Sequence, residues 1–296
     1  MVRSELAKAV AVMAALASCS APMAAESGSS GAEDSSGAPD DTGPVGDTGP
    51  ADDRLLVLPP LSACDPAAPS PGTIRIATWN IGATLFSSFD DVRAVLADVD
   101  ADVVLVQETE IGAVRTGMID QPRALADALA VDYAFAAALK WDGGDFGLTV
   151  LSRLPFSRAR RIALESEETY EPRIALDATV CAGATPVRLV DVHADFVPEA
   201  NLNNLADIAA EIGAVEAPTV IAGDFNAEPD TEGVKGVLAT TGTVDVFAGR
   251  DPGPTRLGRR IDFMLATPGL DAAVSSVLRL ETEASDHALL AMDVAL

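Results

Sequence analysis

Side chains that could bind a metal ion or move a proton stand where several apolar runs of this sequence end. Each of these points carries a carboxylate, an amide or an imidazole. They are Asn80, Glu108, His193, Asp224 with Asn226, and Asp286 with His287. Because strand ends converge at one edge of a sheet, residues far apart in the chain can share one pocket there. The pattern predicts an active site built from the ends of strands.

These side-chain types suit the hydrolysis of a phosphoester. The reaction needs an activated water, compensation of charge on the phosphoryl oxygens and help for the leaving oxygen. Hard divalent cations such as Mg²⁺ prefer oxygen ligands and usually keep several waters. The sequence has two histidines and no cysteine cluster, so it offers no zinc site of the usual kind. Mg²⁺ or Mn²⁺ is therefore the expected cofactor.

Plainer structural roles stay open for several of these residues. Asn80 could be only a turn residue after a strand. His193 and His287 are the only histidines of the chain, and a single histidine is often structural. Glu108 is harder to explain in this way, because an unpaired buried carboxylate is costly.

An α/β fold must position these residues. From Thr73 onward, short runs rich in β-branched residues alternate with Ala- and Leu-rich stretches of helical period. Apolar residues recur at i, i+3 and i+4 in two predicted helices, residues 91–96 and 201–215, and we interpret them as core. The predicted strands are Ile74–Trp79, Val103–Gln107, Thr149–Ser152, Ile174–Val180, Arg188–His193, Thr219–Gly223, Ile261–Leu265 and Ala288–Val294.

The segment Gly223-Asp224-Phe225-Asn226 resembles the Gly-Asp-x-Asn element of the endonuclease/exonuclease/phosphatase family. Five further motifs follow the family's order: residues 77–80 (ATWN), 106–108 (VQE), 192–193 (VH), 260–263 (RIDF) and 285–287 (SDH). Each motif alone is weak, but the ordered set is specific. The resemblance runs from about residue 73 to the C-terminus. It implies a DNase-I-like, metal-dependent phosphoesterase with a four-layer α/β sandwich: two mixed β-sheets face to face, with helices outside.

The resemblance also implies roles for the residues that match these motifs. Glu108 is the expected Mg²⁺ or Mn²⁺ ligand. Asn80 beside it is expected to hold the metal's ligand sphere or a phosphate oxygen. Asp286 is expected to bind the metal or to hydrogen-bond one of its ligands. Arg173 resembles a family position near the substrate, and a purely structural role for it stays open.

The remaining motif residues are expected to carry the chemistry. Asp224 would orient or deprotonate the attacking water. Asn226 and His193 would contact the phosphoryl oxygens as charge builds on them. Asp262 would hold and charge-stabilise His287, which polarises the phosphate.

The sequence differs from the AP endonuclease branch of this family. That branch carries a tyrosine near the phosphate and a basic, aromatic DNA-binding face. This chain has only Tyr133 and Tyr170, with 4% aromatic residues overall, so platforms for stacked bases are scarce. Arg259 and Arg260 could face a phosphate or could form a salt-bridged surface pair. No residue selects among the sphingomyelinase-like, inositol-phosphatase-like and deoxyribonuclease-like members.

The charge of the chain disfavours broad binding to nucleic acid. Of the formal net charge of −25, residues 1–18 carry +1 and residues 19–54 carry −7, which leaves −19 for residues 55–296. Proteins gain most of their non-specific affinity for DNA from Lys and Arg that displace counterions. Nucleic acid stays a possible substrate, because a local basic groove can coexist with an acidic exterior.

The N-terminal residues 1–18 are typical of an export signal. Arg3 and Lys8 precede the apolar run Ala9–Ala17, which is too short to span a bilayer. Leu16-Ala17-Ser18-Cys19 resembles the lipobox of bacterial lipoproteins, which implies a lipid anchor at Cys19. A buried N-terminal helix is the alternative. No Asp follows the cysteine, so the pattern favours a bacterial outer membrane or cell surface.

The chain is therefore expected to have three parts. Residues 1–18 form the lipoprotein signal peptide, and residues 19–54 carry the lipidated cysteine and a disordered acidic linker rich in Gly, Ser, Asp and Pro. Residues 55–296 form the catalytic domain, expected to be a monomer. Cys64 and Cys181 could form a disulfide in an exported protein or remain two separate thiols.

The predicted function is an exported Mg²⁺- or Mn²⁺-dependent phosphoesterase that hydrolyses a phosphodiester or phosphomonoester. An extracellular nuclease of the same family is one alternative. A surface lipoprotein that keeps the fold and only binds its ligand is another. The complete set of motif residues favours an enzyme, because a decayed enzyme would be expected to have lost one of them.

Overall fold

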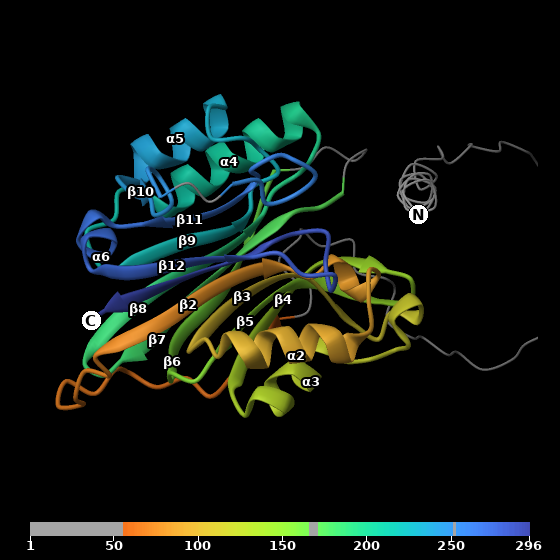
Figure 1. Ribbon diagram of the computed structural model, residues 1–296, viewed down its shortest axis with the longest axis horizontal. Coiled ribbons are helices and arrows are strands. Elements are labelled where there is room, and N and C mark those ends of the chain that lie inside the picture. Colours follow the sequence, from red (N-terminus) through yellow and green to blue (C-terminus); the bar gives the residue numbers. More distant parts are fainter. Residues whose placement is uncertain (1–55, 166–170, 251–252) are drawn as a thin grey trace, which may run out of the picture. The chain divides into compact units, whose positions relative to one another are not determined.

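Two mixed β-sheets form the centre of the computed structural model, which describes residues 56–165, 171–250 and 253–296 (Figure 1). The first sheet has the strand order β1-β4-β5-β3-β2-β13-β12, and the second has the order β10-β11-β9-β8-β7-β6. Strand β2 pairs with β3 in parallel and β8 pairs with β9 in parallel. The other neighbouring strands are antiparallel.

The elements have the following bounds. The first sheet contains β1 (Leu56–Val57), β2 (Thr73–Asn80), β3 (Val103–Ile111), β4 (Asp132–Trp141), β5 (Gly144–Ser152), β12 (Val274–Leu280) and β13 (Leu289–Ala295). The second contains β6 (Phe156–Ala163), β7 (Ile174–Ala182), β8 (Thr185–His193), β9 (Thr219–Asp224), β10 (Val244–Asp245) and β11 (Asp262–Ala266). The helices are η2 (Gly82–Thr84), α2 (Phe89–Val99), η3 (Val114–Thr116), α3 (Gln121–Leu129), α4 (Pro198–Ile212), α5 (Glu232–Thr241) and α6 (Pro268–Ala272).

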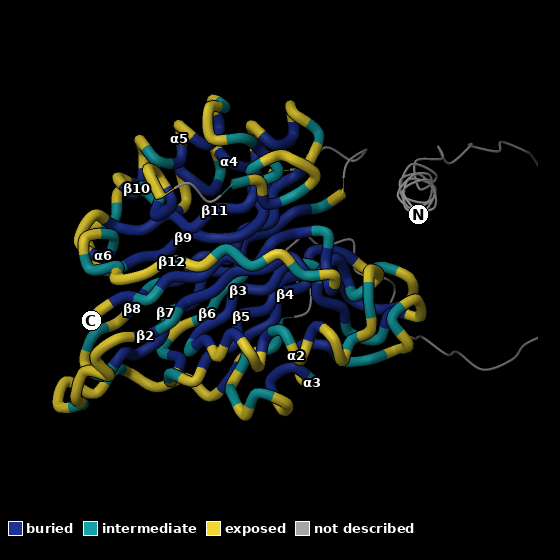
Figure 2. The backbone as a smooth tube through the Cα atoms, viewed as in Figure 1, coloured by how far each residue is buried: buried dark blue, intermediate teal, exposed yellow. Residues whose placement is uncertain are grey.

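Helices cover the outer faces of both sheets, so the predicted four-layer sandwich is confirmed. In β2, Ile74 and Ile76 belong to the apolar core between the sheets. Ala77 and Trp79 of the same strand point the other way and pack in the cluster that contains α2 and α3. Helices α4 and α5 cover the second sheet in the same manner. Strands buried on both faces read as continuous apolar runs, and Figure 2 shows them buried beneath partly exposed helices.

The eight predicted strands and both predicted helices are present. The second predicted helix differs in extent: α4 begins at Pro198 and ends at Ile212. Its C-cap residue Gly213 has φ of +61°, a conformation that favours glycine and stops the helix before Val215.

A disulfide joins Cys64 to Cys181, so of the two possibilities that the sequence left open, the structure has the bridge. The Cα atoms are 5.3 Å apart, and the two residues are separated by 117 positions in the chain. The bond ties the segment that precedes β2 to strand β7. In the chain-entropy model, a cross-link over a loop of this length contributes about 5 kcal/mol to stability.

The signal peptide, the lipidated Cys19 and the linker lie outside the described residues, and they stay predictions. Within the described part of the chain, every helix is too short or too polar to cross a bilayer.

Candidate active site

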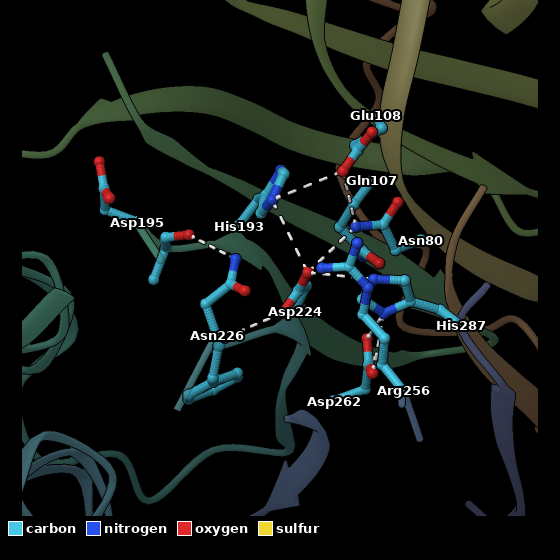
Figure 3. A network of polar contacts seen from close by, with 12 residues as sticks. Asn80, Gln107, Glu108, His193, Asp195, Asp224, Asn226, Arg256, Asp262 and His287 are labelled. Atoms are coloured by element: carbon cyan, nitrogen blue, oxygen red, sulfur yellow. Dashed lines mark hydrogen bonds and ion pairs between the residues drawn. The ribbon is translucent and has the colours of Figure 1, made fainter. Parts of the chain in front are cut away.

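The polar residues at the strand ends meet between the two sheets. Asn80 ends β2, His193 ends β8, Asp224 ends β9 and Asp262 begins β11. By strand alternation, all four lie on the inner faces, in line with the core residues of their own strands. Asp224 pairs in register with both His193 and Asp262, so these three form one row across the second sheet. Figure 3 shows the resulting network.

Glu108 reaches this network through an irregular backbone. Val104 and Val106 of β3 pack in the outer cluster, so alternation would turn Glu108 toward the helices as well. Instead, the register of β3 shifts between Gln107 and Thr109, and Glu108 has φ of +60°. Left-handed conformations in non-glycine residues are strained and gather at functional sites. The bulge therefore presents the Glu108 carboxylate at the mouth of the site.

The amide of Asn80 connects the two sheets. Its Nδ2 donates to Glu108 Oε1 and to Asp224 Oδ2, at 3.0 Å in both cases. Its Oδ1 accepts from the backbone N–H of Gly82 at 2.9 Å. Because nitrogen rather than oxygen faces the carboxylates, Asn80 holds Glu108 and Asp224 in fixed positions. Its predicted role beside a metal stays a prediction.

Asp224 is fully buried and lies beside the hydrogen-bond donors Asn80 and His287. Burial raises its pKa to about 6, and nearby Asp262 adds to the rise. His287, the backbone N–H of Asn226 and the amide of Asn80 oppose this shift. The carboxyl group therefore has a proton affinity suited to a general base near neutral pH.

Asp262 and His287 form a hydrogen-bonded pair. His287 Nδ1 donates to Asp262, at 3.0 and 3.1 Å from its two oxygens, and His287 Nε2 lies 3.7 Å from Asp224 Oδ2. Burial lowers the pKa of His287, but the charges of Asp262 and Asp224 outweigh it and raise the pKa to about 9. The imidazole is therefore protonated at neutral pH and directs an N–H donor toward Asp224.

The Ser285-Asp286-His287 motif has a structural explanation as well. The Ser285 hydroxyl donates to the carbonyl of Asn80 at 2.7 Å and accepts from the backbone N–H of His287 at 3.1 Å. Trp79 Nε1 donates to the His287 carbonyl at 3.0 Å. These bonds attach the loop that carries His287 to the end of β2.

His193 differs from His287 in its charge. Burial lowers its pKa well below the usual range, and the positive charges of Arg173, His287 and Arg256 lower it further. His193 is thus neutral, 3.7 Å from Asp224 and 3.9 Å from Glu108. Arg173 is buried beside it, with Nη1 at 3.2 Å from the ring, and its Nε has no hydrogen-bond partner among the described residues. The predicted placement of Arg173 near the substrate thus agrees with its position, and its role stays a prediction.

Two predicted residues are turned partly away from this centre. Asn226 has φ of +49°, and its Nδ2 donates to the carbonyl of Ala194 at 3.0 Å. Figure 3 shows this amide directed toward the chain beside Asp195. Asp286 accepts from Arg256 Nε at 2.7 Å. The phosphate contact of Asn226 and the metal role of Asp286 therefore stay predictions.

Arg256 is the cation that sequence analysis missed. It lies in the loop before β11, and Figure 3 places its guanidinium beside Asp224. The arginines that the sequence suggested pair with carboxylates outside this centre: Arg259 with Glu228, and Arg260 with Asp245. For these two, the salt-bridged interpretation holds. No periodicity marks the loop, so residue type alone could not separate the three arginines.

A second missed feature lies directly beneath the site. Gln107 Nε2 donates to Asp191 Oδ1 at 2.5 Å and to Thr78 Oγ1 at 3.0 Å. Burial raises the pKa of Asp191 well above its usual range and so favours its neutral form. The pair joins β3 to β8 next to Glu108 and His193. Period-two alternation could have found it, since both residues fall on inner-face positions.

Comparison with known proteins agrees with this geometry. The model of the Endonuclease/Exonuclease/phosphatase family matches residues 77–287. The chain belongs to the endonuclease/exonuclease/phosphatase family. Among curated proteins, no sequence matches it.

Solved structures of this family have the same fold. An endonuclease/exonuclease/phosphatase from Beutenbergia cavernae is 25% identical, with a TM-score of 0.63, over 76% of this chain and 72% of that one. An AP endonuclease from Archaeoglobus fulgidus is 19% identical, with a TM-score of 0.60, over 74% and 98%. A mannosyl-6-phosphatase from Bacteroides thetaiotaomicron is 14% identical, with a TM-score of 0.60, over 75% and 100%. The last two show the fold alone.

Members of the endonuclease/exonuclease/phosphatase family generally use a divalent metal. Here Asp224, Asp262 and His287 offer ligand atoms within 4.8 Å of one another. His287 Nδ1, however, donates to Asp262, so these two side chains engage each other. Glu108 fits a hard cation better: its side chain is 27% exposed, and one hydrogen bond, from Asn80, engages it within the described chain.

The rate of hydrolysis is expected to follow a bell-shaped pH profile. Below about pH 6, Asp224 takes up a proton and is lost as a base; above about pH 9, His287 loses the proton that it offers to the phosphate. Measurement of kcat/KM between roughly pH 4 and pH 11, the range over which both groups titrate, checks the two limbs. Asp262→Asn removes a charge that raises the pKa of His287, so it should move the alkaline limb to lower pH. An unmoved limb would contradict this assignment.

Proposed function

We propose that this chain is an exported, Mg²⁺- or Mn²⁺-dependent phosphoesterase that uses an activated water. One observation carries the proposal: a buried carboxylate with a pKa near neutrality, Asp224, lies 3.7 Å from the protonated ring of His287. A base and an acid this close to each other suit attack by water on a phosphoester.

Each of the surrounding side chains has a task in this reaction. Asp224 accepts the proton of the attacking water, and Asn80 keeps its carboxylate oriented. His287 Nε2 donates to a phosphoryl oxygen as charge builds there, and Asp262 stabilises the imidazolium. Neutral His193 supplies a further hydrogen bond, and Arg256 supplies positive charge. Glu108 would hold the divalent cation, which when bound neutralises phosphoryl charge and polarises water.

The substrate is expected to be small or presented on a surface, rather than long duplex DNA. The relatives named above include an AP endonuclease and a phosphatase, so phosphodiesters and phosphomonoesters are both candidates. Residues 55–296 carry −19, and Arg259 and Arg260, outside the centre, are engaged by carboxylates. A polyanion would meet little counter-charge on such a surface. The nuclease alternative therefore has less support, and the complete site disfavours a protein that only binds.

A substrate panel tests this proposal. We expect the full chain with Mg²⁺ to hydrolyse nucleotides, inositol phosphates or sphingomyelin vesicles faster than plasmid DNA or single-stranded RNA at matched phosphate concentration. His287→Ala serves as the inactive control for contaminating enzymes. Much faster cleavage of plasmid DNA than of every small substrate would make a secreted nuclease the better conclusion. No turnover of any substrate would favour the binding protein.

The anchor at Cys19 belongs to the same proposal. The apolar run and the lipobox-like residues 16–19 support it, and the acidic linker would let the domain stand away from the membrane. In a bacterial host, wild-type chain is expected in the membrane fraction, and the Cys19→Ser variant is expected to lose its acyl group. Mass spectrometry of the N-terminal peptide checks this. An unmodified Cys19 in the exported wild type would refute the anchor.

A further inference from the structure

Large apolar side chains are exposed mainly at the end of the molecule that carries the active site. Ten such residues are exposed within the described ranges, and six of them lie in loops next to strands of the site. We call these six the apolar rim. It consists of Leu85, Phe86, Val114, Met118, Phe196 and Leu257. Single exposed apolar residues are ordinary on protein surfaces, but their concentration around one opening is not.

The topology places the rim residues on several sides of the site. Leu85 and Phe86 follow β2, whose last residue is Asn80, and Phe196 comes three residues after His193. Val114 and Met118 follow β3, which carries Glu108. The rim thus draws on loops from both sheets, because the strand ends that bear the chemistry also lead into these loops.

Leu257 connects the rim to the catalytic residues directly. It lines a recess of about 250 Å³ together with Arg256, Asp286 and His287. Leu257 is 73% exposed, Met118 70% and Phe196 65%, so these side chains lie mostly outside the protein core. A surface that covers Leu257 therefore also lies next to His287.

The charges beside the rim show which surface fits it. Arg115, Arg256 and Arg259 each pair with a carboxylate, namely Glu110, Asp286 and Glu228. The loops therefore offer few free cations, and residues 55–296 carry −19. Such a face is repelled by anionic lipid and by nucleic acid, whereas a zwitterionic bilayer imposes no such repulsion.

The form of the rim and the rest of the chain favour a bilayer over a protein partner. The apolar residues come from separate segments of the chain, after β2, β3 and β8 and before β11, and exposed apolar side chains can enter the soft boundary between headgroups and acyl chains. Upstream of the described residues, the sequence predicts a lipid anchor at Cys19, followed by a linker that ends at residue 54. An anchored domain would meet its own membrane at high local concentration.

We propose that the apolar rim docks on a zwitterionic phospholipid bilayer and that the site hydrolyses the headgroup phosphoester of a membrane lipid. The choice of substrate rests on the phosphoesterase function proposed above, whereas the docking does not. Docking brings the headgroup phosphate over Asp224 and His287, and the lipid's acyl chains stay in the bilayer. Water attacks phosphorus, one phosphoester bond breaks, and the leaving oxygen takes up a proton.

Tryptophan reporters test the docking without any need for turnover. All variants are full chains with Cys19→Ser, so that acylation is absent. We expect Phe196→Trp and Met118→Trp to shift their emission to the blue and to be quenched by phosphatidylcholine vesicles that contain brominated acyl chains. Leu202→Trp on α4 is the matched control, because Leu202 is also exposed but lies outside the rim. Quenching of the rim reporters no stronger than that of the control would overturn the docking and would leave a protein partner as the occupant.

A kinetic comparison tests the substrate. The double variant Phe196→Ser with Met118→Ser should hydrolyse zwitterionic lipids in vesicles at least about tenfold more slowly than the parent, because interfacial binding scales with buried apolar area. It should hydrolyse a soluble aryl phosphodiester at the parent's rate. Leu202→Ser with Leu278→Ser should match the parent on both. Equal vesicle rates for the two double variants, or a parent that cleaves only soluble esters, would overturn the substrate assignment. A parent inactive on both would refute the phosphoesterase function, with the reporter result unaffected.

Discussion

Replacing Asp224 by asparagine is expected to lower kcat/KM for any phosphoester substrate by at least about 100-fold, the usual contribution of a positioned general base. The change preserves shape and keeps one of the two oxygens that accept from Asn80 Nδ2 and from the backbone N–H of Asn226, but it removes the group that takes the proton. His287→Ala should cost at least as much, because it removes the donor to the phosphoryl oxygen. Steady-state kinetics, with circular dichroism to check folding, measures both.

Asp191→Asn provides a matched control for Asp224→Asn. Both aspartates are buried on inner faces of neighbouring strands, and burial raises the pKa of each. Asp191, however, is bonded to Gln107 beneath the site, and burial favours its neutral form. An amide in its place should leave kcat/KM close to wild type. If a folded Asp224→Asn variant kept near-native turnover, or if both variants lost activity equally, Asp224 would not be the base.

Much of the fold could be predicted because its central strands are runs of β-branched residues. Strands that break this pattern were missed. The segment β4 contains four alanines, a residue that favours helices, yet it is buried inside the first sheet between β1 and β5. Strand β6 contains three arginines and lies at the edge of the second sheet, where Arg160 pairs with Asp177. Charge at an edge strand protects it from unwanted pairing, but it hides the strand in the sequence.

The sequence predicted which residues gather in the site only where those residues stand at the ends of strands. The resemblance located the residues, and alternation could have put Asn80, His193 and Asp224 on one face. The sequence held no sign that Glu108 adopts φ of +60°, which alone turns its carboxylate to the same side. It also held no sign that Asn226 turns toward Ala194 or that Arg256 points inward. Loop conformation decides these cases, and loops lack the periodicity that made the strands readable.

Chelation is expected to abolish hydrolysis of an aryl phosphodiester, and added Mg²⁺ or Mn²⁺ is expected to restore it. The physical reason is the negative charge that builds up on the phosphoryl oxygens during attack. Arg256 and His287 are the positive groups beside it. They cannot balance that charge as well as the charges of Asp224, Asp262 and Asp286. Exhaustive treatment with a chelator, followed by titration with each cation, measures the effect. Activity that survives this treatment would count against a metal-dependent mechanism.

Glu108→Gln distinguishes loss of the metal from other effects of the chelator. The amide keeps the shape and an oxygen for Asn80 Nδ2, but it removes the charge that attracts a divalent cation. We expect the Mn²⁺ concentration for half-maximal activity to rise at least about tenfold, as for loss of one ligand's support, and direct Mn²⁺ binding to weaken in parallel. Asp286→Asn should shift both less, because Arg256 already engages that carboxylate. If Asp286→Asn weakened Mn²⁺ binding and Glu108→Gln did not, the cation would be held on the opposite side of the site, by the loop that carries His287.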